Sequence, residues 1–397
     1  MKLALAGVVA AFAAATLLFG DLGRGGGDAA AAAPLDAQAA VARGLVALDQ
    51  ARVRVDPSRY PVAEREFREA LRIGGAEAAA YRGLAGLAAA RHRFAESLRL
   101  AERARRVAPD VAAVYGLLGD ANLELGRHDA AQRAFDRMVE LKPGPTGYAR
   151  ISYARELLGD TEGAIEAMRL AADSAGRAEP TAWALTHLGN LYAGSGRPAR
   201  ARGEYRKALE HEPGYPPALV GLADLAQRRA DLARAERLLR RALARVDDPG
   251  AAAVLGDVLD SQDRVAEAES WWGRAHALEA RFARFGGDNA IETALFDLDH
   301  DRNLRAALVR ARAGLARRPG VEGLHTYAWA LYKNGRCTEA VSFSDRALAL
   351  APTDTGALAH RALIERCLGN GTAAQRFAAR VRALDPTFPT PSPFRLG

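Results

Sequence analysis

One spacing of small residues and prolines recurs along most of the chain, and it constrains the fold more than any other feature. Gly189, Ala201, Ala208 and Pro213 follow one another at intervals of 12, 7 and 5 residues. Successive copies of this frame lie about 34 residues apart. Such a period indicates a stack of similar units rather than one globular core. Other copies begin at Ala85, Gly119, Ser152, Ala223, Gly256, Leu295, Ala328 and Ala362, and a degenerate first copy surrounds Phe67.

Each position of the frame has a physical reason. Gly189 and Ala201 are small, which allows the two helices of one unit to approach closely, and Tyr205 fills the space beside that contact. Ala208 is small because the first helix of the next unit packs there. Gly196 is typical of a residue that ends a helix. One helix pair cannot bury its own apolar face, so the units must stack.

The composition favours helices over strands. Of the 397 residues, 49% are hydrophobic, and Ala and Leu supply most of them, whereas only 7% are aromatic. We therefore expect an all-α superhelix of about ten helix–turn–helix units over residues 40–386. Two segments depart from the repeat, and we expect either to bend the superhelix. They are an extended turn at residues 56–61 and an insertion, "ARFGGDN", in an atypical unit near residues 282–319.

The repeated frame resembles that of the tetratricopeptide-repeat superfamily. Segments such as "YARISYARELLGDTEGAIEAMRLA" and "HTYAWALYKNGRCTEAVSFSDRALAL" are also similar to bacterial tetratricopeptide-repeat proteins with an N-terminal apolar segment and no assigned activity. The resemblance implies a right-handed superhelix whose first helices line a concave groove. It also implies a non-catalytic scaffold or adaptor that holds a partner segment in that groove.

The groove positions of the family transfer to this chain one by one. The middle of the resulting set is acidic and contains no lysine, and aromatic residues flank it. We therefore expect a protein or peptide segment that carries Arg or Lys, with cation–π contacts to the aromatic side chains. The alternative is that these are ordinary solvated polar positions. The set comprises Tyr153, Glu156, Trp183, Thr186, His187, Asn190, Asp224, Gln227, Asp257, Asp260, Asn289, Glu292, Asp299, His325, Trp329, Tyr332 and Lys333.

The N-terminus contains an uncharged apolar stretch at residues 3–20, which is just long enough to span a bilayer. We expect residues 1–20 to be a signal anchor that attaches the chain to a membrane and leaves the repeats outside the cytoplasm. The alternative is a signal peptide, cleaved between Ala29 and Ala33, and secretion. Residues 21–39 are expected to form a flexible Gly/Ala linker, and residues 387–397 a proline-rich tail.

The formal charge of +7 does not by itself indicate a nucleic-acid partner. Only four of the 55 basic residues are lysines, and the arginines alternate with Asp and Glu along the sequence. We expect no nucleic-acid binding. The two cysteines, Cys337 and Cys367, both fall at the turn edge of adjacent units. They can form a disulfide if the chain is exported, and the alternative is two unrelated free thiols.

No nucleophile–base motif, phosphate-binding loop or zinc-ligand spacing occurs in the sequence. The best metal-like cluster, "DLDHD" at residues 297–301, falls at a turn where such residues are usually solvated or cap helices. We therefore assign no catalytic residue, metal or cofactor. The alternatives to a scaffold are a ligand- or peptide-responsive regulator, an enzyme hidden in the atypical unit, and a nucleic-acid binder.

Overall fold

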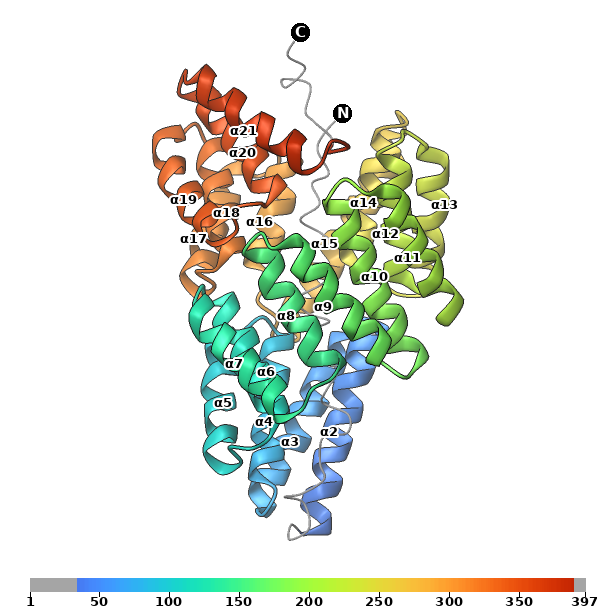
Figure 1. Cartoon of the computed structure of the whole chain (residues 1–397), viewed down its shortest axis with the longest axis vertical. Coiled ribbons are helices and arrows are strands. Elements are labelled where there is room, and N and C mark those ends of the chain that lie inside the picture. The colour runs from blue at the N-terminus through green and yellow to red at the C-terminus, as the bar shows by residue number, and fades with distance from the viewer. Residues whose placement is uncertain (1–33, 389–397) are drawn as a thin grey trace.

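The computed structural model describes residues 34–388, which form twenty α-helices and no strand (Figure 1). The helices are α2 (Leu35–Arg54), α3 (Tyr60–Ile73), α4 (Glu77–Ala90), α5 (Phe94–Val107), α6 (Ala112–Glu124), α7 (His128–Leu141), α8 (Pro145–Leu157), α9 (Thr161–Ser174), α10 (Ala178–Gly194), α11 (Pro198–His211), α12 (Pro216–Gln227), α13 (Leu232–Leu243), α14 (Pro249–Asp260), α15 (Val265–Arg284), α16 (Ala290–Asp299), α17 (Leu304–Arg317), α18 (Val321–Lys333), α19 (Cys337–Leu350), α20 (Thr355–Cys367) and α21 (Gly371–Leu384). A short 3₁₀ turn, η2 (Pro57–Arg59), precedes α3.

Consecutive helices pack as ten pairs, from α2–α3 to α20–α21, so the predicted all-α superhelix of about ten units is confirmed. The predicted boundaries need two corrections. Helix α2 starts at Leu35, inside the linker expected to reach residue 39. Pro34, which has an extended backbone, immediately precedes the helix, and Asp36 places a favourable negative charge in the first helical turn.

The second correction concerns the tail expected from residue 387. Phe388 is buried against Leu358 and Val381, so the packed core extends to the last described residue. The remaining tail, the predicted signal anchor and most of the predicted linker lie outside the described residues. No helix within residues 34–388 combines the length and the apolarity that crossing a bilayer requires.

Close contact between glycine and an aromatic ring defines the core of several units. A Cβ atom at Gly189 would lie 2.5 Å from Tyr205 Cε1, which is too close for any side chain. The same relation joins Gly119 on α6 to Phe135 on α7. Both rings are buried, as are the small residues around them, such as Ala201. The frame thus repeats because each large ring fills the space that a glycine on the partner helix leaves open.

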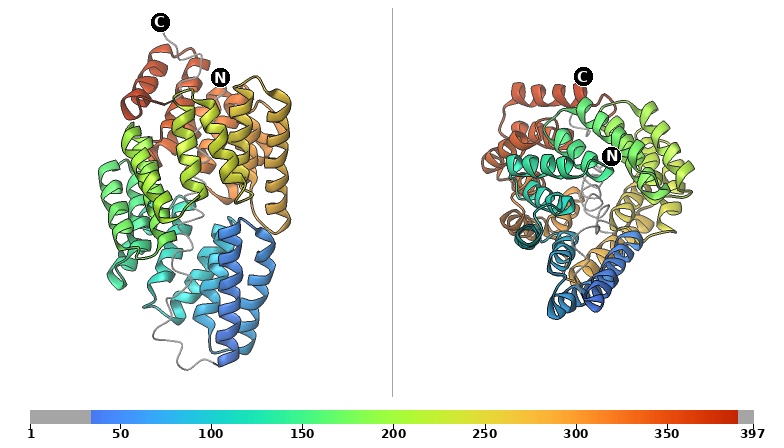
Figure 2. Two further views of the ribbon diagram at one scale, coloured as in Figure 1. Left: turned by 90° about the vertical axis from the view of Figure 1, so that its right-hand side faces the viewer. Right: turned by 60° about the horizontal axis from the view of Figure 1, so that its bottom comes forward.

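The ten units complete more than one superhelical turn, and the two turns touch. Helices α17–α19 lie above α5–α7 in Figure 1, and the helices surround a common axis in Figure 2. Contacting residues of the two turns are typically about 194 residues apart in sequence, as in Arg318–Glu124 and Arg91–Phe285. At 34 residues per unit this separation corresponds to roughly six units per turn.

We call the line of these contacts the inter-turn seam. In it, the turn within a lower unit meets the loop between two upper units. Gly126, with a φ of 72°, shows why the approach is close, because a Cβ there would lie 2.9 Å from the carbonyl oxygen of Pro319. The lower turn contributes Arg91, His92, Glu124, Gly126, Gly159, Gly196 and Arg228, and the upper turn Phe285, Asp288, Glu292, Arg318, Pro319, Gly320, Thr353, Asp385 and Pro386.

The two irregular segments of the sequence also meet one another. The insertion lengthens α15 to 20 residues, which carries Arg281 and Phe282 to the first unit. Arg281 pairs with Asp56 at 2.5 Å, and the ring of Phe282 packs edge-on against Tyr60 at 6.3 Å between centroids. The departures from the repeat therefore make a contact between distant units.

Candidate protein-binding surface

The predicted groove residues of α16 and α18 mostly contact one another or residues of α20. Trp329 Nε1 donates a hydrogen bond of 2.9 Å to Asp299, and the indole stacks between His360 and Tyr332 at centroid distances of 3.6 and 4.9 Å. The Lys333 ammonium lies 5.1 Å from the indole centroid. This cluster is a packed aromatic core rather than an open wall.

His325 extends the same cluster toward α20. Its Nε2 atom lies 2.8 Å from Nδ1 of His360, a residue that sequence reasoning did not select. Burial lowers the pKa of His325, and it lowers the pKa of His360 well below the ordinary histidine value. Both imidazoles are therefore neutral near pH 7, which suits a hydrogen bond between them.

Two of the predicted groove carboxylates in the middle units are already paired. Asp224 accepts a hydrogen bond of 2.8 Å from Arg228, four residues later at the end of α12. Arg228 also binds Asp385 across the seam at 2.6 Å. Asp257 Oδ1 lies 2.7 Å from His300 Nε2 and accepts a 3.0 Å hydrogen bond from Trp272.

Glu292 belongs to the inter-turn seam instead of a free groove. The buried guanidinium of Arg318 lies 2.6 Å from Glu292, 2.5 Å from Glu322 and 3.3 Å from Glu124. His92 approaches Glu292 at 3.2 Å from the other turn. Burial favours the neutral acid, but the attraction of Arg318 and His92 outweighs it and holds the pKa of Glu292 well below its ordinary value.

The acidic middle of the groove, predicted from five carboxylates, is therefore not a free negative surface. Asp224, Asp257, Glu292 and Asp299 have partners inside the molecule, and Asp260 alone has no ion pair or side-chain hydrogen bond within residues 34–388. The partners come from helix ends and from other units. Spacing along one helix face does not reveal them.

Six predicted positions have no side-chain hydrogen bond or ion pair to another residue of the described chain, and they lie on four successive first helices. We call them the α8–α14 strip. In contrast, Asn190 accepts a 2.8 Å hydrogen bond from Tyr205, and the buried Thr186 donates to Ala182 of its own helix. The strip consists of Tyr153 and Glu156 on α8, Trp183 and His187 on α10, Gln227 on α12, and Asp260 on α14.

The electrostatics of the strip indicate that protein surrounds it. The side chain of Glu156 is exposed by surface area, yet desolvation by nearby protein, with repulsion from Asp354 of the other turn, raises its pKa to about 7. Desolvation alone lowers the pKa of His187 to about 4. Trp183 stacks against His187 at 4.1 Å, and its indole N–H is buried without an acceptor within the described chain. These groups lack the polar partners that similar groups have elsewhere in the molecule.

Asn289, the last of the predicted positions, lies in the loop before α16. Its amide donates to the backbone carbonyl and to the carboxylate of Glu279, at 2.9 and 2.8 Å. Burial and the nearby Glu292 raise the pKa of Glu279 to about 7. Asn289 therefore fixes the inserted segment to α15.

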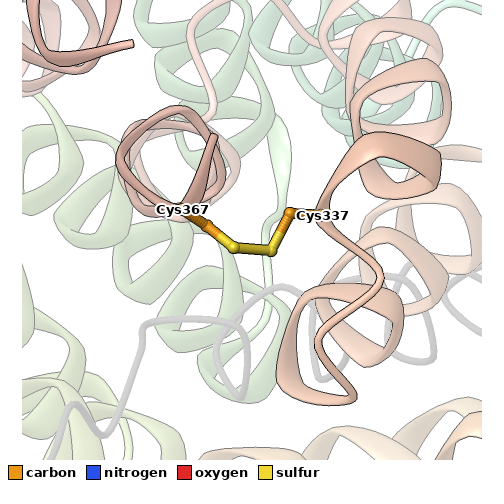
Figure 3. The surroundings of a disulfide bond; sticks show 2 residues. All are labelled: Cys337 and Cys367. Carbon is orange, nitrogen blue, oxygen red and sulfur yellow. A yellow bond between two sulfur atoms is a disulfide. The ribbon is translucent and has the colours of Figure 1, made fainter. Parts of the chain in front are cut away.

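Cys337 and Cys367 form a disulfide, with Cα atoms 6.2 Å apart (Figure 3). Cys337 is the first residue of α19 and Cys367 the last residue of α20. The bond ties the last two units together at their turn edge. Of the two alternatives that the sequence left open, a disulfide or two free thiols, the structure therefore shows the disulfide.

The "DLDHD" cluster is dispersed among structural contacts. Asp297 is buried and pairs with Arg310, Asp299 accepts from Trp329, and His300 binds Asp257. Residues 34–388 contain no group of three or more His, Cys, Asp or Glu side chains arranged to hold a metal ion.

Sequence reasoning missed the residues of the seam, because their partners lie in another superhelical turn. One signal was present. His92 occupies the position at which Gly126, Gly159 and Gly196 stand in other units, and it adopts the same left-handed backbone with a φ of 57°. A histidine in a conformation that favours glycine indicates that its side chain has a role there.

Comparisons with known proteins bear on the repeats. Two tetratricopeptide-repeat models match residues 87–146 and residues 192–258. The chain contains tetratricopeptide repeats. Repeats of this kind typically act as protein-interaction scaffolds without catalytic activity. No curated protein matches the chain in sequence.

Three solved structures illustrate the structural likeness. The hetero-tetramer Cut9–Hcn1 of the APC/C matches with a TM-score of 0.47 and 15% identity over 87% of this chain and 60% of that chain. Yeast Tom70 matches with a TM-score of 0.38 and 15% identity over 87% of this chain and 92% of that chain. PilW, a widely conserved type IV pilus biogenesis factor, matches with a TM-score of 0.42 and 16% identity over 50% of this chain and 92% of that chain. Likeness at this level assigns no partner to the chain.

Proposed function

We propose that the chain is a non-catalytic scaffold that holds a segment of a partner protein against the α8–α14 strip. The proposal rests on a difference between two sets of helices in how many polar side chains have hydrogen-bond or ion-pair partners. On α16–α20 most of the equivalent side chains bind one another, whereas Glu156, His187, Asp260 and the indole N–H of Trp183 have no side-chain hydrogen bond or ion pair within the described chain. The indole N–H of Trp183 is buried without a partner within the described chain, which costs free energy, and a bound segment would supply an acceptor for it and partners for the other polar groups of the strip.

The chemistry of the strip favours a segment with a basic side chain. Glu156 and Asp260 are carboxylates without a cation in the described chain, Tyr153 lies about one helical turn from Glu156 on α8, and Trp183 lies on the next first helix, α10. An Arg or Lys at Glu156 would gain a charge-assisted hydrogen bond from the carboxylate and a cation–π contact with the ring of Tyr153. We further propose that residues 3–20 anchor the scaffold to a membrane and that the repeats lie outside the cytoplasm. The disulfide supports this location, because such bonds persist in oxidising compartments.

Photo-crosslinking in the native membranes tests the proposal. A photoreactive amino acid at Gln227 should crosslink a partner protein, whereas one at Leu170, exposed on the outside of α9, should not. The partner should be lost from the triple variant Glu156→Gln, Trp183→Ala, Asp260→Asn. A control with the same loss of two charges, Glu140→Gln and Asp173→Asn, should keep it. A partner that crosslinks at Gln227 equally well in the triple variant would disprove the assignment of the strip.

Binding to the strip should depend on pH. The pKa of Glu156 is about 7 in the free protein, so its carboxyl must lose a proton before it can pair with a cation. Affinity for the captured basic segment should therefore fall as the pH drops below 7, by up to about tenfold per pH unit for one linked proton. In Glu156→Gln the affinity should be lower at pH 8 and nearly independent of pH between 6 and 8. Calorimetric titration at several pH values measures both effects, and an unchanged pH dependence in the variant would exclude Glu156 as the contact.

A further inference from the structure

Positive charge is concentrated in one part of the superhelix. Residues 197–245 contain twelve arginines and lysines but only six aspartates and glutamates. This excess of six accounts for most of the formal +7 of the whole chain. The alternation of signs that holds for the rest of the sequence fails in α11 and α13.

The arginines of this region gather on one outer face. Arg202 and Arg206 are one helical turn apart on α11, Arg229 precedes α13, and Arg234 lies in the first turn of α13. Besides desolvation, repulsion from Arg229, Arg206 and Arg234 lowers the pKa of Arg202. Helices α11 and α13 are the second helices of successive units, so the four arginines lie on or beside neighbouring second helices. Helices α11 and α13 form part of the outer wall of the molecule (Figure 1).

The arginines of this face are not paired with carboxylates of the described residues. None of its four arginines forms a salt bridge within the described chain, and the carboxylate of Asp231 caps α13 by accepting from the backbone N–H of Arg234. Several arginines on or beside the second helices of other units are instead paired with a glutamate three residues away. Such pairs are Arg72–Glu69, Arg105–Glu102, Arg137–Glu140 and Arg336–Glu339.

We propose that this arginine face, formed by Arg202, Arg206, Arg229 and Arg234, binds the surface of a membrane that contains anionic phospholipids. Guanidinium groups bind phosphate through paired hydrogen bonds, and an array across two helices matches a surface of many headgroups. The face carries no exposed large hydrophobic side chain for insertion into the bilayer. The contact is therefore electrostatic and peripheral.

Two observations favour lipid over nucleic acid as the source of phosphate. Tyr192 and Tyr205, the tyrosines of α10 and α11, are buried, so the face offers no aromatic side chain on which bases stack. Disulfides such as Cys337–Cys367 persist in oxidising compartments and are rare in the cytosol and nucleus, which favours a membrane surface over cellular nucleic acid. The arginine face and the α8–α14 strip are separate surfaces, so this inference does not depend on the scaffold proposal.

Vesicle flotation with the full chain tests the inference. The measured quantity is the ratio of binding to phosphatidylcholine vesicles with and without phosphatidylglycerol, so any insertion of the apolar N-terminal segment cancels. Neutralising four arginines, in Arg202→Gln, Arg206→Gln, Arg229→Gln and Arg234→Gln together, should reduce this ratio at least about tenfold. The control with the same charge change, Arg72→Gln, Arg105→Gln, Arg137→Gln and Arg336→Gln, should change it less than about threefold, because those arginines are already paired.

The salt dependence of vesicle binding tests the same inference with the wild-type chain alone. Raising the salt from 0.1 to 1 M shortens the screening length from about 10 to about 3 Å and should abolish the preference for anionic vesicles. A preference that survives high salt, or an equal loss in both quadruple variants, would overturn the proposal. Tighter binding of the wild-type chain to a DNA duplex than to anionic vesicles, dependent on the same four arginines, would replace lipid by nucleic acid as the occupant.

Discussion

At the scale of single residues, the fold depends on glycines, whose lack of a side chain leaves room for a neighbouring aromatic ring. Tyr205 occupies the space beside Gly189 in its own unit and beside Gly221 in the next unit, where an added Cβ would lie 2.5 Å from the ring in each case. One aromatic ring therefore fixes both the spacing within a unit and the spacing between units. Packed interiors tolerate such overlap poorly, so these glycines are structural.

Replacing Gly189 by alanine should destabilise the protein by about 1–3 kcal/mol, because the methyl group forces Tyr205 out of its site. The matched control is Gly203→Ala on α11, where a Cβ would meet no atom within 4 Å. That change should be neutral or should stabilise the helix by about 0.5–1 kcal/mol. Denaturant unfolding measures both free energies, and equal effects of the two substitutions would contradict the packing argument.

At this scale the sequence predicted which residues pack closely, but it did not predict the polar contacts between side chains. The frame of Gly189, Ala201 and Ala208 identified a close-packed contact, since hydrophobic spacing within one unit determines it. The same spacing could not show that Asp257 binds His300, which lies 43 residues away in another unit. It left Glu156 and Asp260 indistinguishable from carboxylates that are already paired.

At the scale of helices, the sequence located the units but not all of their ends. The second helices end close to the prolines of the frame, and α21 ends at Leu384, just before Pro386. The beginning of α2 was placed too late because no copy of the frame precedes it. The insertion near residue 282 was recognised, but its consequence, the lengthening of α15 to reach Asp56, depends on a contact between units.

The effect of the disulfide can be tested at this scale, because the bond joins α19 to α20, and its cysteines are 30 residues apart in sequence. Closing a loop of that length should stabilise the C-terminal units by about 3–4 kcal/mol. In Cys337→Ser with Cys367→Ser, hydrogen exchange should quicken in α19–α21 and stay unchanged in α4–α5. A reducing agent should reproduce this pattern in the wild-type chain and have no effect on the double variant. Uniform exchange rates before and after reduction would refute a stabilising role.

At the scale of the whole molecule, the inter-turn seam distinguishes this superhelix from a simple stack. Arg318 is the centre of the seam, with Glu124 from the lower turn and Glu292 and Glu322 from the upper turn around it. Nothing in a 34-residue repeat specifies which units meet after one turn. The geometry of all the intervening units determines it, which is why the sequence did not reveal the seam.

Removing the central cation should open the seam. Arg318→Met removes the shared cation of three partly buried carboxylates, of which only Glu292 keeps another partner within residues 34–388, His92, and should cost about 3–5 kcal/mol. The neighbouring Arg317→Met removes an arginine that is 51% exposed and pairs with Asp288, and it should cost less than about 1 kcal/mol. Small-angle X-ray scattering should show a longer particle for Arg318→Met alone. An unchanged scattering profile in a variant that is destabilised would mean that the cluster stabilises the units without holding the turns together.

A coil whose turns already touch can lengthen but cannot shorten. Tension along the axis would separate Arg318 from Glu124 and Gly126 from Pro319, whereas compression meets backbone already in contact. In an ordinary solenoid each unit contacts only its nearest neighbours, so distant units have no direct link. Here the second unit is mechanically linked to the seventh and eighth, and the third to the eighth and ninth, so strain at one end is transmitted across a full turn.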